Sequence, residues 1–402
     1  MGQGRKRRTS KEVTVTADED PEVLPPLFRQ HLPADVSNLL FTFLRVKEIC
    51  IFDKAITNWK ARKVWTQWCA AINGPSMFPT HFRHTLSSLQ WVISHRIKLS
   101  GLALRKIARK GKAADNLQKA IAQLKSPVLT MVNMSYMGAT LTDKALIQFT
   151  KNNPQLTSLQ ASSTKLKNKS IIALAKSCPH LQSVILNNCL GVGNRGAIEL
   201  VVCCSDMNIL DVSGCSGVTD AFAKALYDHA PSVLKSLNLS RVGHLSDSGV
   251  QMIAFACSQL EYINLSADCE GTCGMNITDE SCFALATHCN RLKAVNLNYT
   301  DVTVAGVVAL VQVCEYLERI RLEYVPRIDG EAISEIGKNA RAFRRLATLK
   351  LISVRGNNIS IEDASNFKRE CPFVLLGVDL LDRGLDLRER DQHERSHNGS
   401  EQ

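Results

Sequence analysis

Residues 171–189, IIALAKSCPHLQSVILNNC, contain both halves of a repeating unit. In residues 171–178, apolar side chains fall at i, i+3, i+4 and i+7, the spacing that places them on one face of a helix. Residues 181–186 follow the pattern L-x-x-V-x-L, which is typical of a short strand buried on one side. The stretch therefore predicts a helix that returns directly into a strand, with both elements packed on one core.

The strand pattern recurs along the chain from residue 129. Successive copies begin at Leu129, Leu156, Leu181, Met207, Leu234, Leu260, Leu292, Leu317 and Leu346, with a partial copy at Leu375. Their spacings are 27, 25, 26, 27, 26, 32, 25, 29 and 29 residues, and most match the period of about 20–29 residues of leucine-rich repeats. The sequence thus predicts an α/β solenoid of about nine β-turn-α coils, whose parallel strands line a concave sheet.

Polar side chains precede several of the predicted helices. Their oxygens can accept hydrogen bonds from the backbone N–H groups of the first helical turn, which have no partner inside the helix. The expected caps are Thr142, Ser246, Thr278, Thr303 and Asp329.

Cysteine also recurs in phase with the repeat. Five cysteines lie three residues before the next strand motif: Cys178, Cys204, Cys257, Cys289 and Cys314. A thiol is small and usually buried, so we predict that these are core groups. The alternative is a zinc site at Cys269 and Cys273, with Cys282 nearby, in the insertion that lengthens one repeat to 32 residues. We predict no metal, no cofactor and no catalytic residue, since no cysteine has a His or Asp partner typical of a nucleophile.

The residue types within the repeat are also informative. The segments LQSVILNNC, VTD, ITD and LAKSCPHL resemble the cysteine-containing leucine-rich repeats of F-box proteins, over residues 129–380. Proteins of that family are substrate receptors of cullin–RING ubiquitin ligases. The resemblance implies a protein that recruits a target to a ligase and carries no catalytic residues of its own.

A different pattern precedes the repeats, in residues 31–65. A Leu-Pro pair is followed by apolar residues at helical spacing and then by two tryptophans, which predicts three short helices. This segment is similar to an F-box, and the resemblance implies that a Skp-type adaptor binds Leu32, Pro33, Leu40, Leu44, Trp59 and Trp65. Residues 55–57 read Ala-Ile-Thr where an F-box usually has Val-Cys-Arg. The alternative is a helical cap for the end of the solenoid.

The predicted organisation has five parts. Residues 1–25 and 383–402 are expected to be disordered tails, residues 26–75 the F-box-like module, and residues 129–382 the solenoid. Residues 76–128 form either a basic helical linker or a degenerate first coil that contains Leu102 and Leu104. The net charge is +11, and residues 83–125 hold ten Lys and Arg against one acid, Asp115. Aromatic residues that would stack on bases are nearly absent there, with Trp91 alone, so we do not expect nucleic acid to be the main partner.

Membrane insertion and secretion are not expected. The longest apolar run, residues 305–314, is too short to cross a bilayer, and the chain shows no apolar segment typical of a secretory signal. We therefore expect a cytoplasmic or nuclear protein.

The predicted binding surface follows from the alternation along each strand. Residues between the buried apolar positions face the hollow of the solenoid, and they form columns across successive coils. One column is mostly Asn as far as Asn296 and then becomes Arg321 and Lys350. Tyr and Arg dominate binding hot spots, so we predict that a partner docks at the C-terminal end. The predicted site is Tyr299, Arg319, Arg321, Glu323, Tyr324 and Lys350.

Two details of that site are open to test. Tyr299 and Tyr324 occupy equivalent places in adjacent coils, so their rings are expected to lie side by side. Arg321 and Lys350 are expected to form a positive floor suited to an acidic or phosphorylated partner segment. The alternative is that Glu318 and Glu323 neutralise the arginines.

Three functions are compatible with the sequence. The first is a substrate-recognition adaptor of a Skp–cullin–F-box ubiquitin ligase, with a Skp-type adaptor, a cullin ligase and an unidentified target protein as partners. The second is a leucine-rich-repeat scaffold without a ligase. The third is a basic protein associated with nucleic acid, which the scarcity of aromatic residues disfavours.

Overall fold

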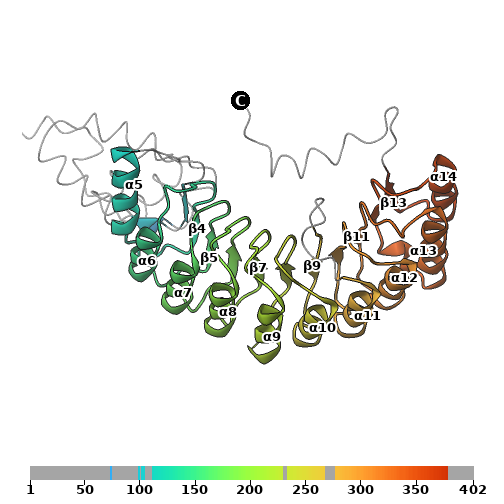
Figure 1. Ribbon diagram of the computed structural model, residues 1–402, viewed down its shortest axis with the longest axis horizontal. Coiled ribbons are helices and arrows are strands. Elements are labelled where there is room, and N and C mark those ends of the chain that lie inside the picture. The colour runs from blue at the N-terminus through green and yellow to red at the C-terminus, as the bar shows by residue number, and fades with distance from the viewer. Residues whose placement is uncertain are drawn as a thin grey trace, which may run out of the picture.

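The computed structural model describes residues 73–74, 98–99, 101–104, 111–229, 233–267 and 277–378. Over these residues the chain is a curved solenoid, with helices along its outer side and a sheet along its inner side (Figure 1). The predicted F-box-like module, with Leu32, Pro33, Leu40, Leu44, Trp59 and Trp65, lies outside the described residues, and so do both tails and the pair Cys269 and Cys273.

The sheet contains eleven parallel strands that follow one another in chain order. They are β3 (Gly101–Ala103), β4 (Met131–Asn133), β5 (Ser158–Gln160), β6 (Ser183–Ile185), β7 (Ile209–Asp211), β8 (Ser236–Asn238), β9 (Tyr262–Asn264), β10 (Ala294–Asn296), β11 (Arg319–Arg321), β12 (Leu351–Ser353) and β13 (Leu375–Gly377). Two further short strands, β1 (Asn73–Gly74) and β2 (Lys98–Leu99), pair in parallel with each other.

A helix follows each strand from β3 to β12, and neighbouring helices pack on one another. They are α5 (Lys112–Gln123), α6 (Asp143–Asn152), α7 (Asn168–Ser177), α8 (Asn194–Cys203), α9 (Asp220–His229), α10 (Asp247–Ala256), α11 (Asp279–His288), α12 (Val304–Val313), α13 (Gly330–Ala342) and α14 (Ile361–Glu370). Because β3 pairs with β4 and α5 packs on α6, residues 101–104 and 111–123 add a strand and a helix to the array ahead of residue 129.

The core is a continuous aliphatic layer between sheet and helices. The middle residue of each strand from β3 to β12 points into it, as Leu159 and Ile320 do, whereas the first and third residues face the hollow. Register is fixed by this alternation, because a slip of one residue would turn every apolar side chain outward.

The last two coils differ from the predicted register. The strand opposite Ile320 is centred on Ile352, so the ninth motif is Leu349, Ile352 and Val354 rather than Leu346, Leu349 and Leu351. Helix α13 has 13 residues where its neighbours have ten, and this lengthening displaces the strand by three positions. The partial motif is displaced as well, since Leu376 pairs with Ile352 where the sequence predicted Val378.

The five repeat cysteines are core residues, as predicted, and each ends a helix. The thiols of four of them, Cys178, Cys204, Cys289 and Cys314, lie against backbone carbonyls of the preceding coil; the Cys204 Sγ, for example, is 3.7 Å from the carbonyl oxygen of Cys178. Burial raises the pKa of Cys204 and of Cys314 to about 12. Cys371 repeats the arrangement at the end of α14.

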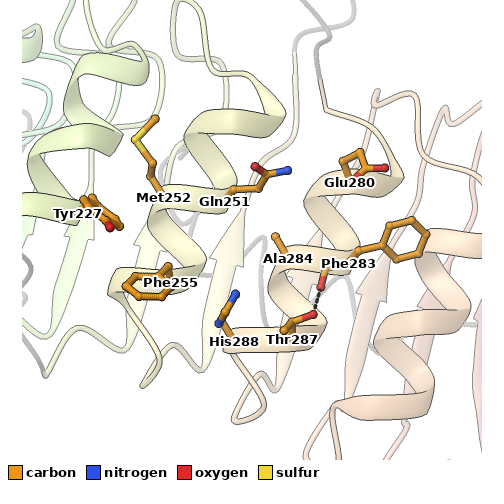
Figure 2. Close-up of a pocket in the computed structure, with 9 residues that line it drawn as sticks. All are labelled: Tyr227, Gln251, Met252, Phe255, Glu280, Phe283, Ala284, Thr287 and His288. Carbon is orange, nitrogen blue, oxygen red and sulfur yellow. Dashed lines mark hydrogen bonds between the residues drawn. The ribbon is translucent and has the colours of Figure 1, made fainter.

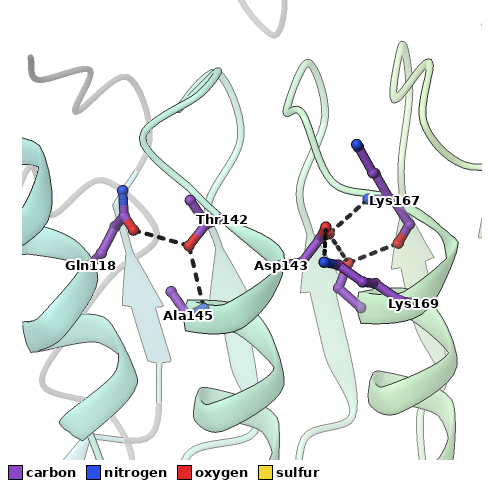
Figure 3. Close-up of polar contacts among 7 residues, drawn as sticks. Gln118, Thr142, Asp143, Ala145, Lys167 and Lys169 are labelled. Carbon is purple, nitrogen blue, oxygen red and sulfur yellow. Dashed lines mark hydrogen bonds and ion pairs between the residues drawn. The ribbon is translucent and has the colours of Figure 1, made fainter.

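The predicted caps are present, and a second set of bonds crosses between coils. Thr142, Ser246, Thr278, Thr303 and Asp329 each accept a hydrogen bond from the first turn of their own helix. In addition, the first residue of a helix accepts hydrogen bonds from the start of the next. The Asp143 carboxylate, for example, accepts from the Lys167 N–H at 2.8 Å and from the Ser170 hydroxyl at 2.8 Å (Figure 3).

These bonds between coils form a ladder, which we call the Asx ladder because its acceptors are Asp and Asn. Its acceptors are Asp143, Asn168, Asn194, Asp220, Asp247 and Asp279. Helices α7 and α8 lack a side-chain cap of their own, so the preceding coil supplies their polar contacts. The ladder ends at α12, whose first residue is Val304 and has no side-chain acceptor.

Candidate functional site

The candidate site lies in the hollow of the solenoid, across β9, β10 and β11 and the turns that follow β10 and β11. Arg319 and Arg321 are the first and third residues of β11, so both side chains face the hollow. Tyr299 and Tyr324 lie in the turns, three residues after β10 and β11 respectively. The site therefore joins strand residues to turn residues in adjacent coils.

The two tyrosines form a stacked pair, as predicted. Their ring centroids are 4.7 Å apart and the ring planes differ by 7°. Both residues have a left-handed backbone, with φ of 57° for Tyr299 and 55° for Tyr324, a conformation that costs free energy for a residue with a side chain. The equivalent turn residue of the next coil is Gly356, with φ of 71°. A Cβ atom there would lie 2.3 Å from the Tyr324 ring, so glycine is needed for this ring position.

The two arginines have no ion-pair partner among the described residues. Neither Arg319 nor Arg321 forms an ion pair there. The Glu318 carboxylate is instead 3.0 Å from the Lys350 ammonium group. The Glu323 carboxylate accepts hydrogen bonds from the Asn298 amide at 3.1 Å and the Ser353 hydroxyl at 2.5 Å. Both acids that were alternatives for neutralising the arginines are thus held elsewhere.

Lys350 does not belong to the predicted column. It precedes β12 and lies one coil beyond Glu318, and Ser353 occupies the place beside Arg321. The Lys350–Glu318 ion pair continues a row in which charges alternate along the edge of the sheet, since Glu261 pairs with Lys235 at 3.7 Å and with Lys293 at 2.6 Å. The corrected register places Arg355, which is exposed, beside Glu323.

The Asn residues of the same column have a structural role. The side-chain oxygens of Asn238, Asn264 and Asn296 each accept a hydrogen bond from the backbone N–H two residues later, at 3.0–3.1 Å. This bond fixes the turn that follows the strand. Arg321 has no such acceptor, and the N–H of Glu323 donates instead to Asn298 Oδ1 at 2.9 Å. The turn is thus maintained while residue 321 presents a charge to the hollow.

Tyr262 belongs to the same surface and was not among the predicted site residues. It is the first residue of β9 and is separated from Arg319 only by Ala294 in the strand between them. Burial raises the pKa of the Tyr262 hydroxyl, while the positive charges of Arg321 and Arg319 oppose that rise, so both guanidinium groups lie near it. The sequence does distinguish this position. The first strand residue is Ser, Met or Ile in the preceding coils from β4 to β8, so Tyr262 departs from the repeat.

A second surface lies on the outer side, between α9, α10 and α11. A hollow of about 420 Å³ is lined by Tyr227, Met252, Phe255, Phe283 and His288, among others (Figure 2). The Tyr227 and Phe255 rings are 5.5 Å apart, and Phe255 is 59% exposed. This is an exposed, largely aromatic patch whose lining also includes Glu280 and His288.

Within the described ranges, no group of three or more His, Cys, Asp or Glu side chains is placed to hold a metal ion. Over the same ranges, no helix combines the length and apolar character needed to cross a membrane.

No protein-family model matches the chain. Among solved structures, it is similar to a chain in the crystal structure of the Rad7–Elc1 complex of yeast, with a TM-score of 0.45 and 16% identity, covering 85% of this chain and 92% of that one. It is also similar to the leucine-rich repeat-containing protein LegL7 from Legionella pneumophila, with a TM-score of 0.44 and 14% identity, covering 69% of this chain and 91% of that one. Identities this low concern the fold alone.

Proposed function

We propose that the protein is a leucine-rich-repeat interaction subunit that holds a target protein on the concave surface of its C-terminal coils. In its finer form, the proposal is that it acts as the substrate-recognition adaptor of a Skp–cullin–F-box ubiquitin ligase. The ligase would supply all catalytic residues.

One observation carries the first part. Two arginines without an ion pair among the described residues face the hollow beside a stacked tyrosine pair, and Glu318 and Glu323 contact other groups. Guanidinium groups without a counter-charge do not stabilise the fold, so these arginines are better explained by binding. Arg and Tyr are among the residues that most often anchor a protein partner. The site fits a segment that brings carboxylate or phosphoryl groups to Arg319 and Arg321.

The ligase link rests on sequence resemblance. The F-box-like residues Leu32, Pro33, Leu40, Leu44, Trp59 and Trp65 lie outside the described residues, so their role as an adaptor surface is supported by their type and order alone. The alternative is a scaffold of the same fold that binds its partner without a ligase.

The concave site is tested by affinity capture with the full chain. The double variant Tyr299→Ala with Arg321→Ala should recover the partner at least tenfold less well, about 1.4 kcal/mol of binding free energy. The matched control is Phe255→Ser, an exposed aromatic residue on the outer side, which should leave recovery unchanged. Equal losses in both variants would contradict a concave site.

The ligase link has its own test, capture of a purified Skp-type adaptor by the full chain. Binding that is lost in Leu32→Asp with Pro33→Ala supports the adaptor function. If the unmutated chain fails to bind at tens of micromolar adaptor, the scaffold alternative is favoured, whatever the concave variants show.

A further inference from the structure

The positive charge of the chain is concentrated in residues 83–176, whose described part includes the first coils of the solenoid. Residues 83–176 hold sixteen Lys and Arg against two acids, Asp115 and Asp143, a net charge of +14. The whole chain carries +11, so all other residues together carry −3. Within residues 111–176 every cation is a lysine, and there are nine of them.

Three helices carry six of these lysines in pairs spaced seven residues apart. Residues seven apart lie on the same side of a helix, about 10 Å apart along its axis. Three successive helices each carry such a pair, and α5, α6 and α7 pack side by side at the N-terminal end of the array (Figure 1). The pairs, which we call the lysine face, are Lys112 and Lys119, Lys144 and Lys151, and Lys169 and Lys176.

The lysine face is exposed and scarcely neutralised. All six lysines are exposed. Lys169 lies 3.4 Å from Asp143 and Lys176 lies 3.3 Å from Glu199, while both lysine side chains remain more than 60% exposed. Asp143 is also engaged by the Lys167 N–H and the Ser170 hydroxyl (Figure 3). The other four lysines form no ion pair with a described residue.

The later helices do not repeat this arrangement. The places equivalent to Lys144 and Lys151 hold Ser248 and Phe255 in α10, and Glu280 and Thr287 in α11. A solvated helical surface needs charge but not a single sign of charge. The lysine face is therefore a property of the first coils and not of the repeat.

We propose that the lysine face binds the phosphate backbone of nucleic acid. Contacts to phosphates need point charges and carry no sequence information, so lysine suffices and stacking residues are not required. The scarcity of aromatic residues disfavours recognition of bases, but it does not disfavour this mode. A protein partner is less well matched, because protein interfaces favour Arg and aromatic residues and are depleted in Lys.

The test is fluorescence anisotropy with the full chain and a labelled 20-base-pair DNA duplex, compared with the single strand, polyglutamate and anionic vesicles. We expect binding to duplex and single strand at about 50 mM salt, with affinity that falls steeply as salt rises. The variant with Lys144, Lys151, Lys169 and Lys176 all changed to Gln should bind at least tenfold more weakly. Its log–log salt slope should be shallower by about 3 to 4, since each neutralised phosphate contributes about 0.9 on duplex DNA.

A charge-matched control separates the face from the net charge. Changing Lys338, Arg341, Lys368 and Arg369 to Gln removes the same four charges from exposed positions on α13 and α14, and DNA affinity should stay within twofold. Equal losses in the two variants, or no binding by the unmutated chain at low salt, would overturn the proposal. Tighter binding to polyglutamate or vesicles than to DNA would overturn it too, in favour of an acidic protein or a lipid surface.

Discussion

The first and last coils of the solenoid share one fold but use their variable positions in opposite ways. In the first coils, the Asx ladder links helices from α6 onward, the turn after β4 is held by an Asn133–Ser135 hydrogen bond, and the lysine face lies on the helices. In the last coils, the ladder has ended, and Arg319, Arg321 and the stacked tyrosines replace the Asn and Ser pattern in the hollow. Residues that follow the repeat maintain the coil, and those that depart from it are the candidates for binding.

The largest expected effect is on the free energy of unfolding, and it compares the loss of hydrogen bonds between coils with the loss of a cap within one coil. Asp247 accepts hydrogen bonds from the Thr278 N–H, the Thr278 hydroxyl and the Ser281 hydroxyl. Asp247→Ala leaves all three donors without this acceptor and should lower the free energy of unfolding by about 2–3 kcal/mol. Asp329 caps only its own helix, so Asp329→Ala should cost about 1 kcal/mol. Urea unfolding measures both, and equal costs would show that the ladder adds nothing to an ordinary cap.

The next effect is the pH dependence of stability, which should be equal at Cys204 and at Cys314 because both thiols are buried. The pKa of Cys204 and of Cys314 rises from 9.0 to about 12 on burial. A folded-state pKa above the unfolded value means that the folded protein holds the proton more tightly, so stability is lost as the pH rises from about 9 to 12. Each thiol should contribute about 1.4 kcal/mol per pH unit in that range.

Removing one thiol at a time tests this symmetry. The free energy of unfolding of Cys204→Ala and of Cys314→Ala, measured between pH 9 and 10.5, should depend on pH less steeply than in the unmutated chain, and by the same amount. A change confined to one variant would mean that the two ends bury their thiols differently.

The smallest effect concerns the column of the hollow. Asn238→Ala removes the acceptor for the Ser240 N–H and should cost about 1 kcal/mol. Arg321→Asn restores the repeat residue where Asn298 already accepts the turn N–H, so stability should change by no more than about 0.5 kcal/mol, while partner recovery falls. A large loss of stability in Arg321→Asn would assign the arginine to the fold rather than to binding.

Local patterns in the sequence were sufficient for the coil and several of its details. The i, i+3, i+4, i+7 spacing located the helices, and residue type identified the five caps. Equivalence between repeats predicted the stack of Tyr299 on Tyr324. Each of these depends on residues within one coil or at matching places in two coils of similar length.

The register of the last coils depended on a helix length that the sequence pattern did not reveal. The repeat motif is matched by Leu346, Leu349 and Leu351. However, α13 continues through Ala342 and a 3-10 turn follows at Arg345–Ala347, so the strand begins later. That displacement moved Lys350 out of the site and left Arg355 unnoticed. The Asx ladder was missed for a different reason, because its donors lie 24–34 residues from their acceptors.

The end of the Asx ladder at Val304 has a consequence for cooperativity. The stability of a repeat array is approximately the sum of what each coil contributes and what each contact with its neighbour contributes. The ladder adds to the neighbour contribution from α6 to α12, so we expect those coils to unfold together. Beyond α12 the helix caps lie within single coils, and neighbouring coils are joined by other bonds, such as those from the Arg345 guanidinium group to the carbonyls of Val311 and Gln312. We expect a partner that contacts Arg321 and Tyr324 to raise the free energy at which these C-terminal coils open.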